Sequence, residues 1–248
     1  SAAAPISTHP LEFVLGLGIP ILEIYGMSEN TGPATISTPD RYRTGSAGWA
    51  MEGTEVKVET DGEICMRGPH ISPGYFKDPA STRETFDAEG WLHSGDIGEI
   101  DDDGFLSVTD RKKELIITSG GKNVAPQSIE SELRGIEVVG QAVVVGDRRN
   151  YLAALLTLDP EALPRVAERI DSPARDLGSA AVCPVLRGHL EAQIDQVNAG
   201  LARFETIKRF AVLPTELSVE GGEMTPTMKL KRRVINQNFA QEIADLYS

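Results

Sequence analysis

The spacing of hydrophobic residues changes along the chain, and each change predicts a different set of elements. Near the start, apolar residues at helical spacing predict a helix that ends near Gly18. A short strand, Pro20 to Ile24, and a loop of small polar residues, Tyr25 to Pro33, are predicted to follow it. Loops at strand ends are where α/β folds place their ligands, so this loop is a candidate site.

Between Gly45 and Val108 the pattern predicts short strands separated by closely spaced turns. The predicted strands are Glu55–Glu59, Glu63–Arg67, Ile97–Ile100 and Phe105–Thr109. The acidic turn Asp101–Asp103 is followed by Gly104, which is free to take the left-handed conformation that such a hairpin requires. A short helix with Asp78 as its cap and Pro79 at its first position interrupts the strands. We therefore expect a small β-rich subdomain here.

Beyond Asp110, helices and strands alternate and predict a second α+β unit. The predicted strands are 114–117, 141–145, 151–158 and 207–213, and the predicted helices are 127–133, 161–169, 185–201 and a last one from 232 onward. A charged run, residues 110–113, lies between the two patterns. We therefore expect an α/β (α+β) chain in which residues 1–109 and residues 114–248 are separate units joined by this run.

The composition is that of a globular protein, with 40% hydrophobic and 25% charged residues. A chain of 248 residues suits one large domain or two ordinary ones, at roughly 100 to 200 residues per domain. The formal net charge of −13 repels polyanions and argues against a general nucleic-acid binder. The longest apolar run, Phe13 to Leu22, is broken by glycines and a proline and is shorter than the ~20 residues that a membrane span needs.

The cysteines and histidines show no metal-binding spacing. Cys65 and Cys183 are far apart and belong to no C-x-x-C pair, so we expect both to be reduced core thiols. The four histidines show no pairing at i, i+4, so a His/Cys metal site is not expected. Any metal is expected to be Mg²⁺ held by carboxylate and phosphate oxygens.

Two polar segments in the first half carry candidate chemistry. In Tyr25–Gly32, the aromatic ring could stack on a nucleobase, the hydroxyls could bond phosphate, and Glu29 could hold Mg²⁺. In Gly90–Asp96, a carboxylate after a tight Ser-Gly turn suits a bidentate hydrogen bond to a ribose diol. Taken alone, the first segment is better explained as an ordinary polar loop and the second by a turn-stabilising aspartate.

Two further segments lie in the second half. The charged run from Asp110 to Glu114 precedes Thr118–Asn123, whose glycines allow close backbone approach to a ligand but lack P-loop spacing. Thr225–Arg233 is a basic segment in an acidic chain, and a lysine on a turn there could meet a carboxylate and a phosphate. Taken alone, the first of these segments is better explained as a solvated linker, and the second by helix-start charges and surface solubility. Their order and spacing are more specific than any single segment.

Together the four segments resemble the core motifs of the adenylate-forming superfamily of acyl-CoA synthetases and ligases. Asp110–Pro126 with Ile129–Glu130 is similar to the AMP-forming long-chain fatty-acid group. The resemblance implies that residues 1–109 are the end of a large adenylation domain with its β-rich subdomain. It implies a hinge linker at residues 110–113 and a small, mobile α+β C-terminal domain at residues 114–248.

The resemblance also implies a role for individual residues. For the nucleotide, it implies that Tyr25, with Gly26 beside it, stacks on the adenine, that the Ser28 hydroxyl lies near phosphate, and that Asp96, with Arg111 next to it, binds the ribose diol. For catalysis, it implies that Glu29 is the catalytic carboxylate that holds Mg²⁺ and that Lys229 is the catalytic lysine of adenylation. It also implies that Lys113 is the hinge and that CoA passes beside Gly120 and Gly121. Ala2–Pro5 resembles the segment that lines the adenine, although glycine is usual there in the family.

The implied reaction activates a fatty acid with ATP to acyl-AMP and pyrophosphate, and then transfers the acyl group to CoA. The Ser/Thr/Gly-rich phosphate loop and the acyl tunnel of the family are not among the 248 residues, which begin at Ser1 without a methionine. We therefore expect an excised piece whose partner is the missing N-terminal region of the same polypeptide. The chain alone is not expected to form acyl-adenylate.

Two alternatives differ in class. A fatty acyl-AMP ligase would pass the acyl group to a carrier protein, and the Gly120–Pro126 segment argues against it. A non-catalytic interaction module would keep the fold, but Glu29, Asp96, Arg111 and Lys229 are all intact. The cytoplasm is the expected compartment, since ATP and CoA are available and thiols stay reduced there. Peripheral membrane contact stays open because fatty acids partition into bilayers.

Overall fold

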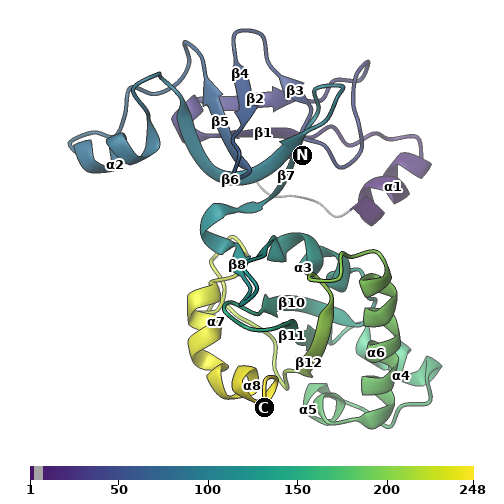
Figure 1. Ribbon diagram of the computed structural model, residues 1–248. Coiled ribbons are helices and arrows are strands. Elements are labelled where there is room, and N and C mark those ends of the chain that lie inside the picture. Colours follow the sequence, from purple (N-terminus) through teal and green to yellow (C-terminus); the bar gives the residue numbers. More distant parts are fainter. Residues whose placement is uncertain (3–7) are drawn as a thin grey trace. The chain divides into compact units, whose positions relative to one another are not determined.

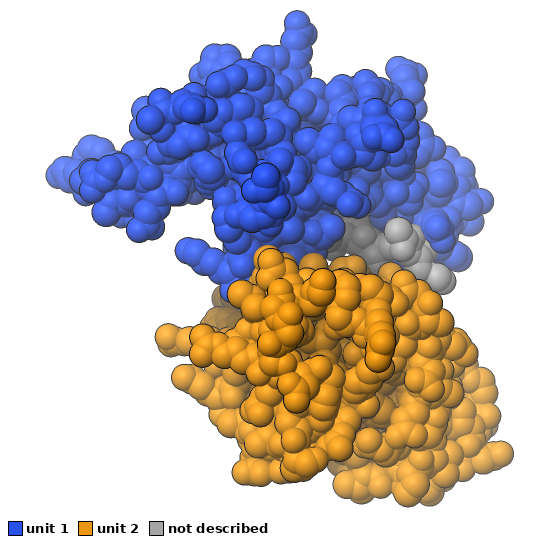
Figure 2. Space-filling model, in the orientation of Figure 1, with its two compact units in different colours: residues 1–114 blue, residues 115–248 orange. Residues whose placement is uncertain are grey.

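The computed structural model describes residues 1–2 and 8–248, apart from the side chains of residues 8 and 9. The chain divides into two compact units, residues 1–114 (unit 1) and residues 115–248 (unit 2), which Figure 2 colours separately. Both units combine helices with strands, so the predicted mixed α/β class is confirmed. Each unit also has a hydrophobic core of its own.

Unit 1 is built mainly from antiparallel strands (Figure 1). Its elements are α1 (Thr8–Gly16), β1 (Ile24–Met27), the 3₁₀ turn η1 (Ser28–Asn30), β2 (Gly32–Ile36), β3 (Trp49–Ala50), β4 (Glu55–Val58), β5 (Glu63–Arg67), α2 (Pro79–Thr85), β6 (Leu92–Ile100), β7 (Leu106–Arg111) and the 3₁₀ turn η2 (Lys112–Glu114). Strands β1, β2 and β3 form one sheet, and β4, β5, β6 and β7 form a second sheet in that order. Antiparallel neighbours can be joined by short turns. The two sheets therefore match the β-rich subdomain that the closely spaced turns predict.

Local turn and cap chemistry in unit 1 follows the sequence. In the β6–β7 hairpin Ile100 lies opposite Leu106, and Gly104 has a φ of +85°. At the start of α2 the Asp78 carboxylate accepts a hydrogen bond from the backbone N–H of Ser81. Both predictions are confirmed, because each depends on residues only a few positions apart.

A small apolar core joins the two sheets of unit 1. Ala34 of β2, Met66 of β5 and Leu92 of β6 are fully buried, and Tyr25 and Met27 of β1 pack against them. Removing this apolar surface from water stabilises the contact by roughly 25 cal/mol per Å². The core therefore holds β1 against β6, the two strands on which the first two candidate segments lie.

The predicted strand at Pro20–Ile24 is wrong, and the loop predicted after it is mostly a hairpin. The strand begins at Ile24, where β1 pairs with β2 and Tyr25 lies opposite Thr35. Thr31, with a φ of 65°, and the following glycine close the turn between the two strands. A strand is defined by its hydrogen-bonded partner, and the partner of β1 lies after the turn. The apolar run near Pro20 therefore does not show where the paired residues begin.

Unit 2 has a three-stranded sheet with helices packed around it (Figure 1). Its elements are β8 (Ile116–Ile117), β9 (Asn123–Val124), α3 (Pro126–Arg134), β10 (Val139–Val145), β11 (Leu152–Leu158), α4 (Leu163–Arg169), α5 (Leu177–Ala181), α6 (Pro184–Ala199), β12 (Ile207–Val212), α7 (Arg232–Asn238) and α8 (Ala240–Asp245). The central strand β11 pairs antiparallel with β10 and parallel with β12. A separate short hairpin, β8–β9, precedes α3.

Both faces of the three-stranded sheet are covered by helices. Every residue of β11 is buried. Leu152 and Leu156 belong to a core that includes side chains of α3, α4 and α6, whereas Ala153 and Leu155 belong to a second core with side chains of α7 and α8. Successive strand residues point to opposite faces, so a strand buried on both sides reads as a continuous apolar run. Figure 1 shows the two helix groups on opposite sides of the sheet.

Most predicted elements of unit 2 are confirmed within a few residues, with two differences. The strand predicted from residue 114 shrinks to β8, and the helix predicted from residue 232 breaks at Phe239 into α7 and α8. The prediction of unpaired core thiols is confirmed, because Cys65 and Cys183 are both free and buried. No helix in the part of the chain that the structure describes is long and apolar enough to cross a membrane.

Candidate functional site

Three predicted site residues meet in unit 1, although they come from three different strands. The Tyr25 hydroxyl of β1 donates a hydrogen bond to Asp96 Oδ2 of β6, with 2.9 Å between the oxygens. Arg111, the last residue of β7, places its Nε 3.3 Å from Asp96 Oδ1. The β6–β7 register sets this pair, because Asp96 lies directly opposite Arg111. The structure therefore brings an aromatic ring, a carboxylate and a guanidinium together.

The electrostatics of this group keep the Tyr25 hydroxyl protonated. Burial, with the neighbouring Asp96 carboxylate as the second cause, raises the pKa of the Tyr25 hydroxyl well above its usual range. Tyr25 is therefore a hydrogen-bond donor at neutral pH. The side chain of Asp96 is 15% exposed and that of Arg111 is 62% exposed. Asp96 is thus a nearly buried carboxylate whose position is set by its neighbours, while Arg111 reaches toward solvent.

Gly26 has a structural reason for lacking a side chain. The pairing of β1 with β2 shifts register between Tyr25 and Gly26, which then lies opposite Pro33. A Cβ built on Gly26 would lie 1.9 Å from the carbonyl oxygen of Gly32 and 2.8 Å from the Cα of Pro33. Both contacts are with backbone, so no side-chain movement relieves them. The irregular pairing turns the chain toward Ser28 and Glu29.

The turn after β1 carries Ser28, Glu29 and Asn30. Ser28 is exposed and Glu29 is half-buried. The backbone N–H of Met27 donates to Asn30 Oδ1 at 2.6 Å, which fixes the turn. Among the described residues, the buried amide nitrogen Nδ2 of Asn30 has no hydrogen-bond partner. An unsatisfied buried donor is costly, which is consistent with an acceptor that a ligand brings to this turn.

The Glu29 carboxylate fits one part of a magnesium site. Its Oε1 accepts a hydrogen bond from the Tyr75 hydroxyl at 2.7 Å, and this bond raises the pKa of Tyr75. A carboxylate has about four lone-pair positions, so the contact with Tyr75 leaves acceptor capacity for a cation. Mg²⁺ is usually held by one or two carboxylates together with water and phosphate oxygens. Glu29 at the edge of a turn matches that requirement.

The predicted hinge residue, Lys113, is exposed in the 3₁₀ turn η2 at the end of unit 1. Its neighbour Lys112 is held more firmly. The Lys112 ammonium lies 2.7 Å from Asp61 Oδ2 and 2.8 Å from Glu63 Oε2, and these hydrogen bonds raise its pKa. The chain is therefore tied to β5 one residue before Lys113.

Gly120 and Gly121 lie at the exposed tip of the β8–β9 hairpin in unit 2. Gly121 has a φ of +73°, in the left-handed region that favours glycine, and its N–H donates to the Thr118 carbonyl at 2.9 Å. Thr118 Oγ1 also accepts the N–H of Lys122 at 3.2 Å. Gly120 and Gly121 therefore present only backbone at the tip, and Thr118 holds the turn in shape.

Lys229 lies in an exposed turn that ends shortly before α7. The Thr225 N–H donates to the Lys229 carbonyl at 2.8 Å, and the Lys229 N–H donates to Thr225 Oγ1 at 3.0 Å. Met228, before it, has a φ of 61°. The turn is therefore closed by a single threonine, and it presents the lysine from a short, well-defined loop.

A buried ion pair anchors the end of this turn, and its two residues are not among the predicted site residues. Arg232, the first residue of α7, bonds both oxygens of Glu130 in α3, at 2.8 and 2.6 Å. Glu130 Oε1 also accepts the N–H of Val144 at 2.7 Å. Side-chain exposures of 17% for Arg232 and 5% for Glu130 show that the pair is nearly dry. The pair lies 102 positions apart in the sequence, so no local spacing reveals it.

The predicted site residues thus divide between the two units. Tyr25, Asp96 and Arg111 are in contact, and Glu29 lies on the turn that follows β1. Lys229 and the two loop glycines belong to unit 2. Of the segment predicted to line the adenine, residues 3–5 lie outside the described residues. Tyr75 also contacts this region and was not predicted. Asn30 lies within the predicted segment Tyr25–Gly32, but no role was predicted for its side chain.

Family models match both halves of the chain. A model of the AMP-binding enzyme matches residues 1–76, and a model of the AMP-binding enzyme C-terminal domain matches residues 113–248. The chain belongs to the AMP-binding enzyme family.

Named relatives and a solved structure agree with this family. The chain is 39% identical over 249 residues to the long-chain-fatty-acid–CoA ligase FadD15 of Mycobacterium bovis, covering 100% of this chain and 41% of that protein. It is 40% identical over 272 residues to the long-chain-fatty-acid–CoA ligase ACSBG2 of Gallus gallus, covering 100% of this chain and 36% of that protein. The chain therefore spans about two fifths of the length of these relatives. The o-succinylbenzoate CoA synthetase MenE of Bacillus subtilis, in complex with the acyl-adenylate intermediate OSB-AMP, matches with a TM-score of 0.71 and 27% identity over 94% of this chain and 44% of that one.

Proposed function

We propose that the chain supplies the nucleotide-contacting surface, the hinge and the small domain of an AMP-forming long-chain fatty-acid CoA ligase. The observation that carries the proposal is the meeting of Tyr25, Asp96 and Arg111 from three strands. Identity along the whole chain with proteins named as long-chain-fatty-acid–CoA ligases supports the acyl substrate class.

The proposed reaction has two steps. In the first, a carboxylate oxygen of the fatty acid attacks the α-phosphorus of ATP, so acyl-AMP forms and pyrophosphate leaves. In the second, the CoA thiol attacks the acyl carbon, the thioester forms, AMP leaves with the carbon–oxygen bonding electrons, and the thiol proton passes to solvent. The first step brings an anion against a polyanion, so cationic groups must neutralise the charge that develops between them.

In unit 1 the proposed nucleotide contacts start from Asp96. The Tyr25 hydroxyl and Arg111 hold the carboxylate in place before a nucleotide binds, which limits the ordering cost on binding. The Tyr25 ring would stack on the adenine, and Asp96 would accept hydrogen bonds from the ribose diol. Ser28 would bond a phosphate oxygen, and Glu29 would hold Mg²⁺. When bound, Mg²⁺ would offset part of the phosphate charge.

In unit 2 the proposed roles are those that the family resemblance implies, and the exposure and shape of the two loops are compatible with them. Lys229, on its short turn, would bond the fatty-acid carboxylate and the α-phosphate during adenylation. The exposed tip at Gly120 and Gly121 has no side chains, so the pantetheine arm of CoA could pass close to its backbone. Lys113 would take up the change in backbone dihedral angles when the small domain turns between the two steps.

The Lys229→Ala substitution tests the proposal in the full-length gene product. We expect adenylation, measured as ATP–pyrophosphate exchange with palmitate and Mg²⁺, to fall on the order of 10²–10³-fold, the usual cost of removing one group that stabilises transition-state charge. Thioester formation from preformed palmitoyl-AMP should change far less. Lys231→Ala, two positions away on the same segment, is the matched control. An equal loss in both variants, or none in either, would contradict the role of Lys229.

The acceptor is tested separately by mass spectrometry of the products. With palmitate, ATP, Mg²⁺ and CoA, we expect palmitoyl-CoA. Accumulation of palmitoyl-AMP without thioester would point to a ligase that serves a carrier protein, and the loop at Gly120 and Gly121 would then need another role. Absence of both products, with the protein folded, would favour a non-catalytic module.

A further inference from the structure

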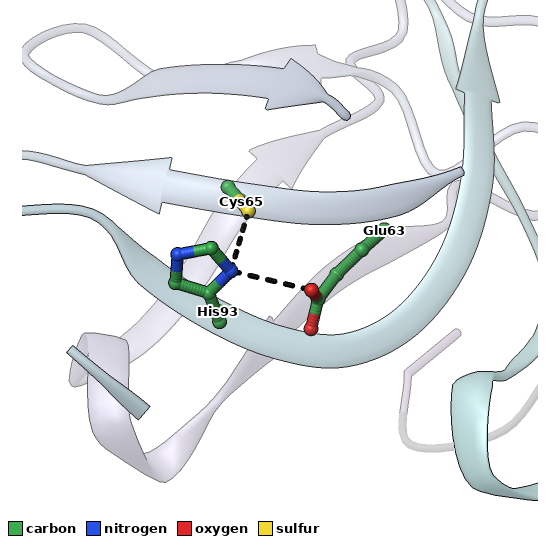
Figure 3. Close-up of side chains that lie close together, drawn as sticks. All are labelled: Glu63, Cys65 and His93. Carbon is green, nitrogen blue, oxygen red and sulfur yellow. Dashed lines mark hydrogen bonds and ion pairs between the residues drawn. The ribbon is translucent and has the colours of Figure 1, made fainter. Parts of the chain in front are cut away.

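A cluster of three potential metal ligands lies in unit 1, and the proposed reaction uses none of them. Among the described residues, Glu63, Cys65 and His93 form a group whose ligand atoms all lie within 4.8 Å of one another. His93 Nδ1 is 3.4 Å from Cys65 Sγ and 3.2 Å from Glu63 Oε2. Figure 3 shows the imidazole nitrogen facing both the sulfur and the carboxylate.

Strand pairing explains why this cluster cannot be recognised from spacing along the chain. Cys65 of β5 lies directly opposite His93 of β6, so their side chains share one face of the sheet. Glu63 is two residues before Cys65, and a strand period of two directs both to that face. Spacing along the chain predicted no His/Cys site, because the neighbours lie 28 positions apart and meet only through the register.

The distances suit a tetrahedral ion. With Zn–S near 2.3 Å and Zn–N near 2.0 Å, a sulfur and a nitrogen ligand on one zinc are separated by about 3.5 Å. The observed separations, 3.4 Å between Cys65 Sγ and His93 Nδ1 and 3.2 Å between His93 Nδ1 and Glu63 Oε2, are close to that ligand–ligand distance. Thiolate, imidazole and carboxylate are also the three side-chain ligand types that zinc takes in proteins. The third separation, between Cys65 Sγ and the ligand oxygen of Glu63, is within 4.8 Å, so an ion between the three atoms requires these two side chains to move closer together at most.

Neighbouring groups orient two of the ligands. Asp87 Oδ2 lies 3.4 Å from His93 Nε2, so a proton held there leaves a lone pair on Nδ1 toward the cluster. The backbone N–H of Gly95 donates to Glu63 Oε1 at 3.0 Å, which leaves Oε2 toward His93. Glu63 and Cys65 are 7% and 0% exposed, so packing within the sheet restricts the positions of both side chains.

The charge around the cluster favours a cation. A pocket of about 520 Å³ borders it, and five carboxylates, including those of Asp61 and Asp87, line this pocket together with the cationic side chains of Arg83 and Lys112. Carboxylates outnumber cationic side chains in this lining, and a concave surface focuses their field. The Lys112 ammonium already occupies one place on Glu63 Oε2, at 2.8 Å.

We propose that Glu63, Cys65 and His93 bind one zinc ion through Oε2, Sγ and Nδ1, with the fourth position open to the pocket. Binding converts the Cys65 thiol to a thiolate, and its proton passes to the buffer. It also displaces the Lys112 ammonium from Glu63 and leaves that ammonium with Asp61. Because Lys112 precedes the proposed hinge residue Lys113, an occupied site removes the contact that ties this stretch to β5 and leaves the contact with Asp61, which precedes that strand.

Metal titration of the reduced 248-residue chain tests the proposal. Equilibrium dialysis with Zn²⁺ should give one ion per chain, and Co²⁺ in its place should give the near-ultraviolet charge-transfer band of a cobalt–thiolate bond. Cys65→Ser should abolish the band. Cys65→Ser and His93→Gln should each weaken zinc binding by more than about 100-fold, because loss of a residue that only supports a metal ligand typically lowers metal affinity 10–100-fold. Cys183→Ser and His189→Gln are the matched controls and should change neither readout.

A second variant separates zinc coordination from a structural role of the cluster. Lys112→Met removes the competing ammonium, so we expect zinc affinity to rise several-fold. Far-ultraviolet circular dichroism checks that each variant is folded, and the titration of the unsubstituted chain stands without any variant. The absence of stoichiometric zinc, a cobalt complex without the thiolate band, or weaker binding by Lys112→Met would each overturn the proposal.

Discussion

Individual carboxylates connect segments that are far apart in this chain. Asp96 accepts a hydrogen bond from Tyr25 and pairs with Arg111, which fixes the proposed ribose contact within unit 1. In unit 2, Glu130 pairs with Arg232 through both oxygens. The two carboxylates differ in their surroundings, because Asp96 has a partner that reaches solvent and Glu130 has one that is nearly buried. Loss of a partner should therefore cost far more at Glu130.

We expect Glu130→Met and Arg232→Met each to lower the free energy of unfolding of unit 2 by about 3–5 kcal/mol, because each leaves one buried charge without its partner. The double variant should cost less than the sum of the two, since it leaves no uncompensated charge. Urea unfolding measures all three. Arg165→Met, at a surface pair where Arg165 is 73% exposed, is the control and should cost less than about 0.5 kcal/mol. Additive costs, or single costs below 1 kcal/mol, would contradict this role for the pair.

At the scale of elements, the sequence predicted what is local and missed what depends on pairing. The Asp78 helix cap, the β6–β7 turn and the apolar run of β11 follow from neighbours along the chain, so their predictions were confirmed. The strand placed at Pro20–Ile24 was wrong because the partner of β1 lies beyond a turn. The same limit hid the Glu63, Cys65 and His93 cluster. Resemblance supplied the motif residues, but only the register shows which of them touch.

The β1–β2 hairpin makes a prediction of its own at Gly26. Gly26→Ala places a Cβ against the backbone of the paired strand, so the hairpin must open or slide. We expect a loss of about 1–3 kcal/mol of unit 1 stability, typical of overpacking, together with weaker AMP binding. Chemical unfolding and calorimetric titration with AMP measure these effects.

The control for this prediction is a glycine with open space. Gly188 lies in α6, and a Cβ there meets nothing within 4 Å. Gly188→Ala should stabilise unit 2 by up to about 1 kcal/mol, because alanine favours the helix. If Gly26→Ala were as well tolerated as Gly188→Ala, the hairpin would not require a glycine at that position.

At the scale of the whole molecule, the two units differ in how much core each contains. The two clusters of unit 2 are formed by residues between Ile116 and Leu246, and they cover both faces of its sheet. The cluster described in unit 1 has three buried residues, Ala34, Met66 and Leu92, with partly buried neighbours. Stability rises with the apolar surface that a unit buries, so unit 2 has the larger hydrophobic contribution of its own.

Unit 2 is therefore expected to fold by itself. Residues 115–248, produced alone, should unfold in one cooperative transition with a free energy of about 5–15 kcal/mol, the usual range for a single domain. Leu156→Ala, at a fully buried position of β11, should cost about 2–5 kcal/mol in the separate unit and the same amount in the 248-residue chain. Urea unfolding of both forms measures this, since equal costs require the same core in each. A non-cooperative transition, or a cost seen only in the longer chain, would show that the core of unit 2 needs residues before 115.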